Sequence, residues 1–88
     1  MLFSFKIQRP NNLSKTIENL KQEFGKNGGP NDTFEGNEKF GKLISNKVEG
    51  TYEVFDDHIL ITIIKKPMIY PPAAVERTIR DGFLKMSE

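Results

Sequence analysis

The stretch from Val48 to Pro67 reads VEGTYEVFDDHILITIIKKP, and its alternation predicts a single β-hairpin. If Asp56-Asp57 form a two-residue turn, the opposed pairs are Phe55–His58, Val54–Ile59, Tyr52–Ile61 and Gly50–Ile63. One face of the hairpin is then apolar or glycine throughout: Val48, Gly50, Tyr52, Val54, Ile59, Ile61 and Ile63. A shift of one residue would turn Glu49 and Glu53 into the core, so the register is well determined.

The rest of the chain supplies three more strands and two helices. Alternation in Leu2–Gln8 predicts a half-buried strand. Pro10-Asn11-Asn12 offers an asparagine N-cap, and apolar residues at helical spacing follow it. This helix is expected to end at Gly25 as its C′ residue, before the polar loop Lys26–Asp32. A last helix begins at Pro71-Pro72 and buries a stripe of Val75, Ile79, Phe83 and Met86.

A second hairpin precedes the first one. A turn at Asn37-Glu38 would place Phe34 opposite Gly41, and a turn at Asn46-Lys47 would place Gly41 opposite Tyr52. Gly41 is therefore expected to make room for one of these two rings. A helical crossover followed by a meander gives the sheet order 2-3-4-5-1. Residues 1–88 are thus expected to form one two-layer α+β domain, with a five-stranded antiparallel sheet and both helices on one face.

Composition narrows the functional classes. The 88 residues carry a net charge of +1, which favours neither nucleic acid nor an anionic membrane as a partner. There is no cysteine, so disulfides, thiolate chemistry and cysteine-bound metals are excluded. The longest apolar run is shorter than a membrane span, and the opening MLFSFKIQRP does not resemble a secretion signal. A cytoplasmic location is expected.

No segment supplies a complete set of catalytic or metal-binding residues. His58 is the only histidine and follows Asp56-Asp57, which would make half of a metal or acid–base site, but these residue types are also typical of a turn. The glycines of Gly28-Gly29-Pro30 follow a helix, whereas a phosphate-binding loop leads into one. Lys65-Lys66-Pro67 would contact an anionic partner or protect a strand end from edge pairing. We expect no enzyme, cofactor or metal.

The second face of the sheet is the candidate site. With both helices on one side, four apolar side chains are expected to be exposed on the other, among charged ones: Phe40, Ile44, Leu60 and Ile64. An exposed patch of this kind marks a partner surface, although scattered surface hydrophobes are also common. Single-stranded nucleic acid could bind there through Phe40 and nearby lysines (Lys6, Lys42 and Lys66), but Glu49 and Glu53 on the same face oppose it.

The sequence resembles a small family of uncharacterised bacterial proteins over residues 31–86. The matching motifs are Phe34-Glu35-Gly36-Asn37, Glu49-Gly50-Thr51-Tyr52, Lys65-Lys66-Pro67 and Val75-Glu76 with Ile79. More loosely, its order of elements is similar to the polyhydroxyalkanoic acid system proteins, which are linked to polyester storage granules. The resemblance implies this fold and a bacterial source, and it assigns no catalytic residue.

Two functions follow as expectations. The first is a non-enzymatic interaction module that forms a homodimer, or docks an unidentified protein partner, through the open sheet face. The second is a granule-associated or small apolar-ligand-binding protein, with a cavity between helices and sheet that Gly41 and Gly50 would help to open.

Overall fold

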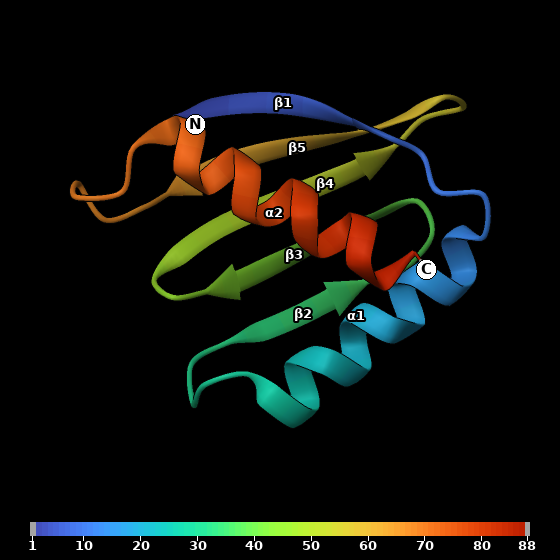
Figure 1. Ribbon diagram of the computed structural model, residues 1–88, viewed down its shortest axis with the longest axis horizontal. Helices are drawn as coiled ribbons and strands as arrows, with labels where there is room; N and C mark the ends of the chain where they lie inside the picture. The colour runs from blue at the N-terminus through green and yellow to red at the C-terminus, as the bar shows by residue number, and fades with distance from the viewer. Residues whose placement is uncertain (1, 88) are drawn as a thin grey trace.

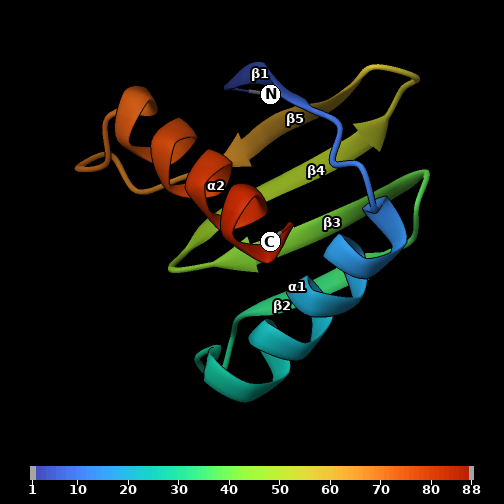
Figure 2. The same ribbon diagram turned by 45° about the vertical axis from the view of Figure 1, so that its right-hand side comes forward.

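The computed structural model describes residues 2–87 and confirms the expected α+β architecture (Figure 1). The elements are β1 (Phe3–Gln8), α1 (Leu13–Asn27), β2 (Thr33–Gly36), β3 (Phe40–Ser45), β4 (Val48–Val54), β5 (His58–Lys65) and α2 (Pro72–Met86). The five strands form one antiparallel sheet in the order β1-β5-β4-β3-β2. Both helices lie on the same side of this sheet, so its other face is uncovered (Figure 2).

Two tight turns determine the register of the three central strands. Asn46 and Lys47 adopt left-handed φ angles of 52° and 68°, as a type I′ hairpin turn requires. At the next turn, the Phe55 N–H donates to the His58 carbonyl oxygen at 2.8 Å. The predicted pairs are confirmed, and they include Ser45–Val48, Leu43–Gly50, Gly41–Tyr52, Gly50–Ile63, Tyr52–Ile61 and Val54–Ile59.

The predicted register between β2 and β3 is wrong by two residues. Phe34 pairs with Leu43, and Gly36 pairs with Gly41, so that residues 37–40 make a longer turn. The Asn37 side chain stabilises this turn, because its Oδ1 accepts the N–H groups of Lys39 at 2.7 Å and Phe40 at 3.0 Å. A shift of two residues preserves the face of each side chain, and Phe34 is therefore still buried.

Helix α1 begins as predicted and ends later than predicted. Asn12 Oδ1 accepts the Lys15 N–H at 3.2 Å, which is the expected N-cap bond. Gly25 lies inside the helix, which continues to Asn27 and ends where the Gly28 N–H donates to the Phe24 carbonyl at 3.1 Å. The Phe24 ring packs against Phe34 with centroids 5.5 Å apart, and this contact with β2 holds the last turn against the sheet despite the glycine.

Helix α2 follows the predicted pattern. Pro72 is its first residue, Val75 and Phe83 are buried, and Arg80 Nη2 lies 2.7 Å from Glu76 Oε2 on the exposed side. In the part of the chain that the structure describes, neither helix is long and apolar enough to cross a membrane.

Tyr52 lies at the centre of the core between the sheet and both helices. Only 2% of its surface is exposed, and its ring stacks on Phe34 and meets Phe83 edge-on. Its hydroxyl donates to the Asn37 carbonyl oxygen at 2.6 Å. Burial raises the pKa of Tyr52 to about 12 from its ordinary value of 10.0, although the hydrogen bond to Asn37 acts in the opposite direction.

The raised pKa of Tyr52 predicts a loss of stability in alkali. The folded protein holds the phenolic proton more tightly than the unfolded chain, so this contribution is present below pH 10 and is lost as the pH rises towards 12. It amounts to about 3 kcal/mol. At neutral pH we expect Tyr52→Phe to be less stable than wild type by about 1 kcal/mol, because it lacks the hydrogen bond. As the pH rises from 10 towards 12, we expect Tyr52→Phe to become the more stable of the two proteins, because it has no phenolic proton to lose.

Urea unfolding at a series of pH values measures the free energy of unfolding of both proteins and shows the pH at which their order reverses. Tyr70→Phe is the matched control, because Tyr70 is 37% exposed and lies outside the core cluster. Parallel pH profiles for wild type and Tyr52→Phe would contradict the prediction.

Candidate functional site

The open face of the sheet carries the four predicted residues, and they differ in exposure. Phe40 is 62% exposed and Ile64 is 46% exposed, whereas Ile44 and Leu60 are half-buried by their neighbours. Each of them adjoins a residue of the core face on its strand, and successive side chains of a strand point to opposite faces, so each points away from the helices. The structure therefore places all four side chains on the predicted face.

The strand register shows how these side chains are arranged. Phe40 lies opposite Glu53 of β4, and Glu53 lies opposite Leu60 of β5. At the other end of the strands, Ile44 lies opposite Glu49, which pairs with Lys65 at an irregularity beside Ile64. Phe40 and Leu60 thus form one apolar pair, with Glu53 between them, and Ile44 and Ile64 form the other, with Glu49 between them. A polar row separates the two pairs, and it consists of Ser4, Thr62, Thr51, Lys42 and Glu35.

The charges of this face are nearly balanced. Lys42 Nζ lies 3.7 Å from Glu49 Oε1, and Lys6 stands in the row that contains Glu53. Lys66 follows β5, and its ammonium nitrogen lies 3.4 Å from the Pro67 carbonyl oxygen. The lysines considered for nucleic acid therefore do not line one continuous basic surface together with Phe40, and a phosphate backbone would meet Glu53 as well.

His58 forms a local contact at the β4–β5 turn. Its Nδ1 lies 2.6 Å from Asp57 Oδ1, and its ring stacks on Phe55 with centroids 4.9 Å apart. The hydrogen bond from His58 lowers the pKa of the fully exposed Asp57 carboxyl. Among residues 2–87, no group of three histidine, aspartate or glutamate side chains is placed to hold a metal ion. The geometry is that of a turn residue with a carboxylate neighbour.

Zinc or manganese is accordingly expected to leave the melting temperature unchanged. A metal that binds only the folded protein would raise that temperature, and a tighter-binding metal would raise it more. His58→Gln is expected to change the free energy of unfolding by less than about 0.5 kcal/mol, as for other surface positions. A metal-dependent rise of the melting temperature in wild type, absent in His58→Gln, would restore a metal site here.

A groove lies on the other side of the sheet, where α2 and Tyr70 face the ends of β3 and β4. The helices meet where Asn19 Nδ2 donates to the Met86 carbonyl at 2.9 Å and Thr16 Oγ1 donates to Ser87 Oγ at 3.3 Å. From there they diverge towards the β3–β4 turn (Figure 1). The groove has a volume of about 340 Å³ and is lined by Leu43, Ser45, Asn46, Val48, Tyr70, Ala74, Val75, Thr78 and Ile79.

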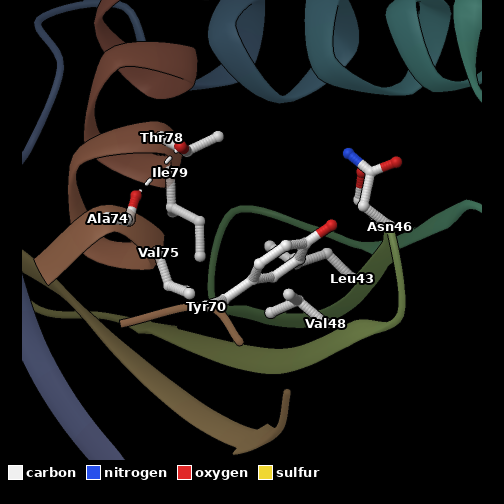
Figure 3. Close-up of a pocket in the computed structure, with 9 residues that line it drawn as sticks. Leu43, Asn46, Val48, Tyr70, Ala74, Val75, Thr78 and Ile79 are labelled. Carbon is white, nitrogen blue, oxygen red and sulfur yellow. Dashed lines mark hydrogen bonds between the residues drawn. The ribbon is translucent and has the colours of Figure 1, made fainter. Parts of the chain in front are cut away.

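The lining of the groove is mostly apolar. The Tyr70 ring lies across it above Leu43 and Val48, and its hydroxyl points towards the β3–β4 turn that carries Asn46 (Figure 3). The Thr78 hydroxyl is already bonded to the Ala74 carbonyl at 3.0 Å. Such a site would hold a small apolar molecule, with Tyr70 and Asn46 as polar groups at one end.

The expectation that strand glycines open a cavity is wrong. Neither Gly41 nor Gly50 lines the groove. The space beside Gly41 is filled by the Tyr52 ring, and a Cβ at Gly50 would lie 3.1 Å from Ile63 Cδ1. The groove lies instead between α2 with Tyr70 and the ends of β3 and β4 that join at Asn46. Tyr70 has only a weak sequence signal, an aromatic residue among prolines just before a helix.

Comparison with known proteins adds no identification. No protein-family model, curated protein or solved structure matches this chain significantly.

Proposed function

We propose that this protein is a non-enzymatic interaction module that associates with a second copy of itself through the open sheet face. The observation that carries the proposal is an uncovered five-stranded face on which Phe40 and Ile64 are 62% and 46% exposed. Each Å² of apolar surface that a partner covers contributes about 25 cal/mol. A bacterial source and a cytoplasmic location belong to the same proposal, and they rest on the sequence alone.

The size and charge of the face suit a second copy. The molecule measures 34 × 27 × 19 Å, so its broad face is large enough for the roughly 800 Å² that each partner contributes to a standard interface. Lys6 and Lys42 balance Glu49 and Glu53, so two such faces approach without strong repulsion. A twofold contact needs only one self-complementary surface, which makes a dimer the simplest assembly.

The non-enzymatic part of the proposal rests on the position of His58. The single histidine lies at the β4–β5 turn beside an exposed aspartate, at the opposite end of β5 from the groove. A general base must lie within hydrogen-bond reach of a bound substrate.

Sedimentation equilibrium tests the dimer. We expect wild type to be dimeric at micromolar concentration, and Phe40→Asp and Ile64→Asp to be folded monomers, since each places a charge in the contact. Leu84→Asp is the matched control, because Leu84 is 66% exposed on α2, away from the open face, and this variant should stay dimeric. A wild type that is monomeric at all concentrations would contradict self-association.

A second candidate function is the binding of a small apolar molecule in the groove. The volume of about 340 Å³ falls at the lower end of ligand sites, which span about 300–1,000 Å³. The granule-associated role suggested by the family resemblance belongs with this candidate, because both require an apolar ligand.

Two neighbouring alanines separate groove binding from surface binding. Both alanines are exposed, but only Ala74 lines the groove. If an apolar fluorescent probe binds stoichiometrically in the groove, Ala74→Leu should weaken it about tenfold or more by filling the space, and Ala73→Leu should not. Equal effects of the two substitutions, or no saturable binding, would eliminate this candidate.

A further inference from the structure

The loop between β5 and α2 exposes two large apolar side chains almost completely. Met68 is 97% exposed and Ile69 is 83% exposed, the highest values among the large apolar residues of the described chain. The loop comprises residues 66–71 and projects from the end of the molecule opposite the β4–β5 turn (Figures 1 and 2). A feature of this kind marks a contact with a protein or a membrane.

The segment that forms this loop carries only basic charged side chains, although Glu49 of β4 pairs with Lys65. The chain as a whole carries +1, but no acidic residue occurs between His58 and Val75, while Lys65 and Lys66 stand directly before the loop. Leu2 donates its N–H to the Ile63 carbonyl at 2.8 Å, so the start of β1 adjoins the end of β5. The residues before Glu18 also include no acidic side chain. Apolar tips beside lysines complement a surface with a negative outer layer and an apolar interior.

Part of the loop backbone forms hydrogen bonds within the chain or lacks an N–H group. Pro67 and Pro71 have no N–H group, and the Tyr70 N–H donates to the Pro67 carbonyl at 3.1 Å. The Pro71 carbonyl accepts the N–H groups of Ala74 at 3.0 Å and Val75 at 3.2 Å. Unpaired backbone groups are what make irregular segments costly to move out of water. The prolines also restrict the chain, so less conformational entropy is lost on binding.

We propose that this loop inserts Met68 and Ile69 into the surface of a membrane that contains anionic lipids, with Lys65 and Lys66 at the headgroups. A lipid surface accepts a projecting tip without a matching pocket, whereas a protein partner would have to provide one. The lysine side chains place their apolar stems beside the tip and their ammonium groups in the phosphate layer. This contact is peripheral, and the inserted residues Met68 and Ile69 lie in the loop, outside the sheet face proposed for the dimer.

A single tryptophan reports the insertion, since the chain has none of its own. We expect the emission of Ile69→Trp to shift to the blue when vesicles of equimolar phosphatidylcholine and phosphatidylglycerol are added, because the ring leaves water. Leu84→Trp, at an exposed apolar position of α2, should show no shift. Equal shifts in the two variants, or none in Ile69→Trp, would overturn the proposal.

Co-sedimentation with the same vesicles tests the wild-type residues. We expect Met68→Ser/Ile69→Ser to lower vesicle binding about tenfold or more, and Lys65→Gln/Lys66→Gln to lower it at least about fivefold. Binding should weaken with salt and with vesicles of phosphatidylcholine alone. The thermal midpoint should not change in the first variant, because both side chains are exposed. Unchanged binding by either double variant would overturn the proposal, as would a wild type that changes its oligomeric state through this loop and ignores vesicles.

Discussion

Gly41→Val is expected to lower the free energy of unfolding by about 3 kcal/mol or more. A Cβ atom at Gly41 would overlap the Tyr52 ring and would lie 2.6 Å from the Glu35 carbonyl oxygen. The ring cannot move aside easily, because it is packed between Phe34 and Phe83. Denaturant midpoints measure the effect, and an unchanged midpoint would contradict the pairing of Gly41 with Tyr52.

A double-mutant cycle identifies the clash as the cause. In Gly41→Ala the added methyl group meets the Tyr52 ring, so truncating the ring in Tyr52→Ala should relieve part of the cost, and the two effects should not add. Gly25→Ala is the control, because a Cβ there meets nothing within 4 Å and the residue lies inside α1. It should stabilise the protein by about 0.5–1 kcal/mol. Strict additivity in the cycle would mean that the cost of Gly41→Ala has another origin.

Ile63→Asp and Ile64→Asp are expected to have very different effects although the two residues are neighbours. Ile63 is fully buried in the core beneath the helices, whereas Ile64 is 46% exposed on the open face. Ile63→Asp loses about 2–3 kcal/mol of apolar burial and places an unpaired carboxylate in the core, which costs several kcal/mol more. Because domains of this kind are stable by only about 5–15 kcal/mol, we expect this variant to be unfolded.

Ile64→Asp should remain folded, with a change of about 1 kcal/mol or less in the monomer. Far-UV circular dichroism and dispersion of amide NMR signals distinguish the two states. A folded Ile63→Asp, or an unfolded Ile64→Asp, would mean that Ile63 lies on the open face and Ile64 lies in the core. The pair therefore tests the fold independently of self-association.

The sequence alone determined the order of elements, the strand order and the register of the three central strands. These depend on local information: strict alternation, with Glu49 and Glu53 kept out of the core, and two-residue turns at Asn46-Lys47 and Asp56-Asp57. The face on which Phe40 and Ile64 lie follows from the same alternation, so the candidate interaction face was also predictable.

Four features are evident only in the folded chain: the β2–β3 register, the end of α1, the groove and the exposure of Met68 and Ile69. The Asn37 turn is held by the hydroxyl of Tyr52, which lies 15 residues later in the chain, and the last turn of α1 is held by the contact of Phe24 with Phe34. The groove is formed by α2, Tyr70 and the ends of β3 and β4, which come together only in the folded chain. Each feature depends on contacts between segments far apart in sequence, and local propensity contains no information about such contacts.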